Sequence, residues 1–294
     1  MNFRRTLTVL AGTAFTLGLL SAGIRPAIAG PLHNGWTYSI DSFNDGTEWN
    51  ASSRRLMMGE NSEFEFYGMA YKETSDKIFF AINSNLSLDG YYQRGARNNR
   101  ISYGDLFLNF SNLSSFNAAN SRRELYAIRF DGTNDTGVQL GLYSNVQASS
   151  LTGANSGYGK IQDHTREVAR YGGSASYGDM EATTSYFRQN QGAFTTINRG
   201  NYVGEVSLIS DVSNLGLDFA HFNAVGDYTF GFSVDRSALP TGDFVASLFA
   251  ECGNDGIVLE GETKDVPEPS AMVGLVAAGL MFGGTRLRLR RQAV

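Results

Sequence analysis

The sequence predicts an all-β protein, an antiparallel β-sandwich or jelly roll, with an apolar segment at each end of the chain. Two observations predict this fold class. Short alternating or continuous apolar runs recur along the middle of the chain, separated by Gly, Asn and Asp turns. Helical periodicity is hard to find there, and strands do not alternate regularly with helices, which argues against an α/β fold. The 294 residues are enough for one large β domain with a sizeable core.

Eight segments carry the strand signal. Some alternate apolar and polar side chains, as a half-buried strand does, and others are continuous apolar runs typical of a buried strand. They are residues 64–71, 77–83, 106–110, 126–130, 138–143, 202–208, 228–234 and 244–249. Residues 145–200 are polar and Gly-rich, so we expect long loops and weak edge strands there, and a short helix is expected near 213–217.

The N-terminal segment, residues 1–29, has the three parts of a secretory signal peptide. Arg4 and Arg5 form the positively charged part, and an apolar run follows at 7–20. Ala27 and Ala29 then supply the small residues that signal peptidase accepts. We therefore expect cleavage after Ala29 and export of the rest of the chain. The alternative is an uncleaved anchor helix.

The C-terminal segment, residues 265–294, also has three parts in a fixed order. Val266, Pro267, Glu268 and Pro269 come first, and the two prolines cannot continue a helix or a central strand. An apolar run of about 14 residues follows. It is short for a transmembrane helix, which needs roughly 20 residues, although arginines that reach toward the interface can extend it. A basic end, expected to stay in the cytoplasm, is made of Arg286, Arg288, Arg290 and Arg291.

This tail resembles the PEP-CTERM sorting signal of exosortase substrates. In that family an integral-membrane exosortase recognises the Pro-Glu-Pro site, cleaves nearby and releases the body toward the outer surface. The family is typical of bacteria with an outer membrane that make exopolysaccharide and biofilm. The resemblance implies transient anchoring in the inner membrane, and then a position on the cell surface or outside the cell. A plain single-span anchor is the alternative.

The body, residues 30–264, carries two further resemblances. The order YGMAYKETSDKIFFAINSNL followed by GDLFLNF is similar to carbohydrate-binding and related jelly-roll modules. The stretch 36–256 resembles a cyanobacterial-type family of exosortase-dependent surface proteins, most clearly at 134–137 and 249–256. The second resemblance implies no particular activity.

Composition excludes one class of partner and one kind of cross-link. Seven of the 24 Lys and Arg residues and two of the 29 acidic residues lie in the end segments, so the body carries 17 basic and 27 acidic groups, a net charge of −10. Such a body does not suit phosphate-backbone binding, and no nucleic-acid partner is expected. The single cysteine, Cys252, permits no intramolecular disulfide, and we expect it in the core.

The sequence shows no catalytic motif that we recognise. His33, His164 and His221 are the three histidines of the sequence, and we expect His164 in a loop region and His221 in a strand. Neither a nucleophile-elbow motif nor a zinc-protease motif occurs. We therefore expect a non-catalytic surface or matrix protein. The alternative is an extracellular polysaccharide hydrolase or lyase that uses paired carboxylates as acid and base.

Asp and Asn residues cluster on Gly-containing turns, where they supply the oxygen ligands that suit Ca²⁺. The spacing is not that of an EF-hand, and Asx-rich turns also arise because Asp and Asn tolerate turn geometry. Both interpretations stay open. The candidate Ca²⁺ ligands are Asp41, Asp45, Asp131, Asn134 and Asp135, and Asp255 lies in a similar turn.

Tyr91 and Tyr92 form a candidate ligand-binding pair beside several arginines. Sugars stack on aromatic faces, while neighbouring polar groups bind hydroxyls. The ligand expected on this basis is exopolysaccharide. Packing and protection of a sheet edge are the alternative roles for these tyrosines.

Overall fold

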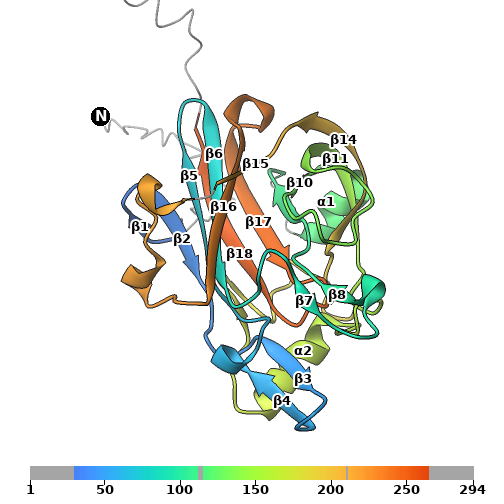
Figure 1. The fold of residues 1–294 in the computed structure, drawn as a ribbon. Helices are drawn as coiled ribbons and strands as arrows, with labels where there is room; N and C mark the ends of the chain where they lie inside the picture. Colours follow the sequence, from blue (N-terminus) through green and yellow to red (C-terminus); the bar gives the residue numbers. More distant parts are fainter. Residues whose placement is uncertain (1–29, 112–114, 210, 265–294) are drawn as a thin grey trace, which may run out of the picture.

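The computed structural model describes residues 30–111, 115–209 and 211–264, which are coloured in Figure 1. The predicted signal peptide and the predicted sorting tail, with their cleavage-site and arginine residues, lie outside these ranges. Within the described ranges, no helix has both the length and the apolar character that crossing a membrane requires.

Short strands dominate the described chain. The strands are β1 (Leu32–His33), β2 (Trp36–Ile40), β3 (Thr47–Asn50), β4 (Arg55–Met58), β5 (Phe66–Glu73), β6 (Lys77–Ser84), β7 (Tyr91–Tyr92), β8 (Arg100–Ile101), β9 (Leu106–Asn109), β10 (Leu125–Arg129), β11 (Gly141–Ser149), β12 (Ser176–Tyr177), β13 (Met180–Glu181), β14 (Thr196–Gly204), β15 (Ser207–Ile209), β16 (Tyr228–Asp235), β17 (Gly242–Phe249) and β18 (Gly256–Thr263). The α-helices are α1 (Phe116–Arg122) and α2 (Ile161–Arg170), and single 3-10 turns are η1 (Gly59–Asn61), η2 (Arg97–Asn99), η3 (Ser213–Leu215), η4 (Phe219–Phe222) and η5 (Arg236–Ala238).

Two six-stranded antiparallel sheets form the body. The first has the order β1-β2-β5-β6-β16-β15, and the second has the order β14-β11-β10-β9-β17-β18. Three two-stranded hairpins, β3-β4, β7-β8 and β12-β13, are added to them. Figure 1 shows β3, β4 and α2 together at one end of the molecule. The prediction of an all-β, antiparallel body is confirmed for the part of the chain that the structure describes.

The largest hydrophobic cluster draws side chains from both sheets. Phe232 of β16 stacks on Phe130, which follows β10, with ring centroids 4.4 Å apart. Tyr71 of β5 meets the ring of Phe244 of β17 edge-on at 5.1 Å. Aromatic contacts of this kind add to the stabilisation from burial alone. Cys252 belongs to the same cluster and is 0% exposed, so its predicted core position is confirmed.

The segment predicted as one strand at 202–208 is in fact two. β14 pairs with β11 in the second sheet, whereas β15 pairs with β16 in the first, so the chain passes from one sheet to the other at residues 205–206. An alternating pattern shows that residues are extended, but it does not show which neighbour they pair with. The prediction of a single strand here was wrong for that reason.

The prediction of loops and weak edge strands at 145–200 was partly wrong. Strand β11 continues to Ser149, and helix α2 occupies the middle of this region. The helix buries only Ile161, His164 and Val168, which are spaced three and four residues apart along one face. Such a narrow apolar stripe in a polar helix is a weak periodic signal.

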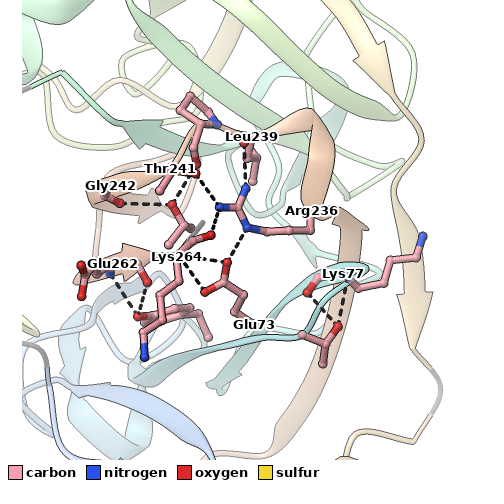
Figure 2. A network of polar contacts seen from close by, with 12 residues as sticks. Glu73, Lys77, Arg236, Leu239, Thr241, Gly242, Glu262 and Lys264 are labelled. Carbon is pink, nitrogen blue, oxygen red and sulfur yellow. Dashed lines mark hydrogen bonds and ion pairs between the residues drawn. The ribbon is translucent and has the colours of Figure 1, made fainter. Parts of the chain in front are cut away.

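The end of the last strand is tied to the rest of the body by a buried ion pair (Figure 2). The Arg236 guanidinium, only 3% exposed, pairs with the Glu73 carboxylate at the end of β5. It also donates to the carbonyl oxygen of Lys264 at 2.6 Å, and the Lys264 amide donates to Glu73 at 3.1 Å. The chain therefore has a fixed position up to the last residue before the predicted tail.

Candidate cation site and surface aromatics

Four acidic side chains from distant parts of the chain meet inside the molecule. Asp41 and Asp45 lie between β2 and β3, Glu65 immediately precedes β5, and Asp255 lies between β17 and β18. One oxygen atom from each of Asp45, Glu65 and Asp255 lies within 4.8 Å of the others. These three residues are 0% exposed and Asp41 is 7% exposed. We call these four residues the buried carboxylate cluster.

Backbone amides hold the carboxylates of the cluster in place, those of Asp41, Asp45 and Glu65 by one oxygen atom and that of Asp255 by both. Asp45 Oδ2 accepts from the Ser176 amide at 2.7 Å, and Glu65 Oε2 accepts from the Gly46 amide at 2.7 Å. Asp255 Oδ2 accepts from the amide of Phe66 at 2.8 Å, and Asp255 Oδ1 accepts from the amide of Gly256 at 2.7 Å. Asp41 Oδ1 likewise accepts from the amides of Ser42 and Gly178, each at 2.9 Å.

Three of the other oxygens have no partner among the residues that the structure describes. Asp41 Oδ2, Asp45 Oδ1 and Glu65 Oε1 are buried and accept no hydrogen bond from those residues. Burial, opposed in part by the amide hydrogen bonds, raises the pKa of Asp41 and Glu65. Burial and the charges of the neighbouring carboxylates raise the pKa of Asp45 and Asp255. Burying several carboxylates together is therefore costly unless something neutralises them.

His164 lies beside this cluster but brings no positive charge to it. It is in α2 and not in a loop, and its Nε2 atom is 2.8 Å from the Asp45 carbonyl oxygen. The side chain is 0% exposed, and burial lowers the pKa of His164 to about 4. Near neutral pH the imidazole is uncharged, with Nε2 donating to that carbonyl.

The second predicted group of Ca²⁺ ligands lies elsewhere and is held by protein donors. Asp131 Oδ1 accepts from the Thr133 amide and hydroxyl, and Oδ2 accepts from the Tyr103 amide at 3.3 Å. Asn134 Oδ1 accepts from Arg129 at 2.9 Å, and Asp135 Oδ2 accepts from Asn155 at 3.0 Å. The arrangement has the features of an Asx-rich turn with its hydrogen bonds made.

Tyr91 and Tyr92 play different parts. Tyr91 packs against the main core, meets Phe64 edge-on at 5.6 Å, and donates its hydroxyl to Glu48 at 2.9 Å. Tyr92 lies on the opposite face of the short strand β7 and is 70% exposed. Trp49, in the nearby β3-β4 hairpin, is 57% exposed and lines a small cleft of about 50 Å³ with Gln93. Tyr92 and Trp49 are therefore two aromatic side chains, among the described residues, that an external ligand can reach.

The prediction that His221 lies in a strand was wrong, because it belongs to η4, where the Asp218 carboxylate accepts from its amide at 3.1 Å. Its ring stacks on that of His33 with centroids 3.8 Å apart. His33 Nε2 is 3.3 Å from Asp218 Oδ2, so this hydrogen bond already engages the carboxylate. Asp218 also lines, with Asp211, a surface cleft of about 390 Å³.

Glu65 is the cluster residue that the sequence did not predict, because the pattern around it does not indicate a buried carboxylate. It stands between Phe64 and Phe66 in an apparently alternating run, where a polar residue is expected to face solvent. All three side chains are buried, and Asp255 of the second sheet contacts this segment by accepting from the Phe66 amide. Asp255 had only the signal of an Asx-rich turn.

Comparison of the chain with protein families, with curated proteins and with solved structures finds no match to any of them.

Proposed function

We propose that the chain is an exported, exosortase-processed protein of the cell surface or extracellular matrix, with a non-catalytic body of the β-sandwich or jelly-roll class. The observation that carries this proposal is the order of the sequence: a signal peptide, the body, then the Pro-Glu-Pro, apolar and basic parts of the tail. Signal peptidase and an exosortase are the processing partners, and the inner membrane holds the chain only until cleavage.

The boundaries of the body support this order. Strand β1 begins at Leu32 and strand β18 ends at Thr263. Cleavage after Ala29 or beside Pro267 would thus remove none of the described strands. Aromatic contacts between residues of the two sheets, such as Tyr71 with Phe244, support the sandwich arrangement.

Exopolysaccharide is the ligand class that the exposed aromatics would serve. Trp49 and Tyr92 offer apolar ring faces to solvent, and Gln93 adds an amide beside Trp49. A sugar needs this pairing of a flat apolar surface with polar groups for its hydroxyls.

The targeting part of the proposal is tested in cells. Deletion of residues 267–294 is expected to leave the body folded and to prevent its release at the surface, so that fractionation finds it in the compartment reached after export. The matched control replaces only Pro267 and Pro269 by alanine, which should retain the apolar segment in the membrane. If both variants reach the surface as the wild type does, the tail is not a sorting signal.

A polysaccharide hydrolase or lyase is the second candidate, because Asp211 and Asp218 line one cleft of about 390 Å³. A glycosidase acid needs a raised pKa. The pKa of Asp211 is instead lowered, chiefly by a hydrogen bond from Ser213. Release of reducing ends from exopolysaccharide that disappears in both Asp211→Asn and Asp218→Asn would establish this alternative, whereas no release by the wild type would exclude it.

A further inference from the structure

We infer that the buried carboxylate cluster is a calcium site, in which Asp45, Glu65 and Asp255, supported by Asp41, bind one Ca²⁺ ion and join the two sheets. The inference concerns the folded body and does not depend on the proposed export or sorting.

The oxygens converge and are already oriented. One atom each from Asp45, Glu65 and Asp255 falls within a 4.8 Å span, which is the spacing of ligands around one ion. Backbone amides hold the other oxygen of Asp45 and of Glu65, so each carboxylate is fixed in orientation. The unpartnered oxygens of the cluster include Asp41 Oδ2. Asp41 is not one of the three residues whose oxygens converge within 4.8 Å, and it is only 7% exposed. A buried acceptor without a donor points to a ligand that supplies positive charge.

Among the residues that the structure describes, no Lys or Arg side chain pairs with a carboxylate of the cluster. The hydrogen bonds that these carboxylates accept come from backbone amides and from the Ser176 hydroxyl. His164 contacts the backbone carbonyl of Asp45 and not its carboxylate. Ionised carboxylates buried without a counter-charge are strongly unfavourable, and a divalent cation removes that cost.

The chemistry of the ligands favours calcium over other divalent ions. The set consists of carboxylate oxygens, with no thiolate and no histidine nitrogen among the three convergent atoms. Zinc and the later transition metals prefer nitrogen and sulfur. Magnesium usually keeps several waters in a strict octahedron, whereas calcium accepts a shell made largely of protein oxygens in flexible geometry. Three fully buried carboxylates fit the calcium pattern better.

The site would join segments that are far apart in the chain. Asp45 follows β2 and Glu65 precedes β5, both strands of the first sheet, whereas Asp255 connects β17 to β18 of the second. The Asp255 carboxylate, from the second sheet, accepts a hydrogen bond from the amide of Phe66 in the first sheet. Because the ligand residues are closed to solvent, the ion would enter as the three segments come together, so that binding and folding are coupled. A chain with no disulfide would gain from such a cross-link.

The first experiment measures thermal unfolding of the full chain, purified in a mild detergent and stripped with a chelator. Added Ca²⁺ at millimolar concentration is expected to raise the unfolding temperature by several degrees, and Mg²⁺ at the same concentration to raise it far less. Calorimetric titration is expected to give one Ca²⁺ per chain. An unfolding temperature that is the same in chelator, Ca²⁺ and Mg²⁺ would overturn the inference.

Two glutamate variants separate a metal site from a merely structural acidic group. Glu65→Gln keeps an oxygen for the Gly46 amide but loses the charge, so Ca²⁺ affinity should fall roughly 10-fold or more. In chelator this variant should be at least as stable as the wild type, because a buried charge has been removed. Glu251→Gln, in the separate acidic group that accepts from the Ser102 and Asp135 amides, is the matched control. Both oxygens of Glu251 accept backbone amides, which the amide nitrogen of glutamine cannot do, so this variant should be less stable in every condition and keep the full shift on adding Ca²⁺. Equal Ca²⁺ shifts in the two variants would contradict the assignment.

A spectroscopic measurement covers the case in which Glu65→Gln does not fold. Tyr177 is buried and follows Ser176, whose amide donates to Asp45, and its ring stacks on that of His164, which contacts the Asp45 carbonyl, so Tyr177 lies close to the cluster. Tb³⁺ bound in place of Ca²⁺ should luminesce on excitation of tyrosine, and added Ca²⁺ should quench this signal by competition. Tb³⁺ luminescence that persists undiminished in excess Ca²⁺, or none at all with the folded wild type, would refute the site.

Discussion

The Arg236 guanidinium donates to the carbonyl oxygen of Lys264 at 2.6 Å, and Lys264 is the last residue that the structure describes before the predicted tail. The same guanidinium pairs with Glu73 while only 3% of it is exposed. The junction between the body and the tail is thus part of the folded body. A protease acting at Pro267 would find its site a short distance beyond a fixed point.

Replacement of Arg236 by methionine should destabilise the protein by about 3–5 kcal/mol, because it leaves the Glu73 carboxylate largely buried without its partner. Urea unfolding measures the change. The matched control is Lys77→Met, which breaks an exposed pair with Asp235 and should cost less than about 1 kcal/mol. Similar losses for the two variants would show that the Arg236 network does not hold the end of the body.

The two neighbouring tyrosines should respond in opposite ways. Tyr91→Phe removes the hydroxyl that bonds Glu48 and should lower the free energy of unfolding by about 1–3 kcal/mol, with polysaccharide binding unchanged. Tyr92→Ala should change stability by less than about 0.5 kcal/mol and weaken binding, since this ring is exposed. Glycan arrays and urea unfolding of both variants test this. Binding that is lost with Tyr91→Phe and retained with Tyr92→Ala would reverse the assignment.

The thiol of Cys252 should be inert in the folded protein. It is 0% exposed, and burial raises the pKa of the thiol to about 12, so little reactive thiolate forms near neutral pH. A disulfide reagent such as DTNB should label it only as the protein unfolds in urea, with the same midpoint as loss of β structure. Labelling of the native protein at the rate of a free cysteine would contradict the core position.

Asp105 should make stability depend on pH. Burial raises its pKa to about 6, although hydrogen bonds from Thr136, Ile197 and Asn134 lower it. Because this folded-state pKa lies above the unfolded value, the contribution to stability is largest in acid and is lost as the pH rises through about 6. Asp105→Asn removes the titration. The difference in unfolding free energy between wild type and variant should therefore shrink by about 2 kcal/mol between about pH 4.5 and about pH 7.5. A difference that stays constant or grows would contradict this.

The sequence predicted strands best where a continuous apolar run corresponds to a strand that is central in its sheet. The run at 77–83 became β6 (Lys77–Ser84) and that at 228–234 became β16 (Tyr228–Asp235), which pair with each other. Both are central in the first sheet, so burial on two faces makes their apolar signal strong. β18 (Gly256–Thr263) was missed because its apolar residues are few and its glutamates lie between buried positions.

The candidate site was predictable only in part, for a similar reason. Asp41 and Asp45 stand four residues apart on a turn, a pattern that is visible in the sequence. Their convergence with Glu65 and Asp255 depends on how the two sheets meet, which is a long-range property that no local pattern reports. The difference between Tyr91 and Tyr92 likewise depends on which face of β7 meets the core.

We propose above all that both ends of the chain are targeting signals that are removed during export. Mass spectrometry of the intact protein recovered from the cell surface or the medium tests it most directly. We predict a mature chain that begins at Gly30 and ends close to Pro267, with a mass well below the 32.0 kDa of the full chain. Recovery of the protein with Met1 and Val294 both present would contradict it.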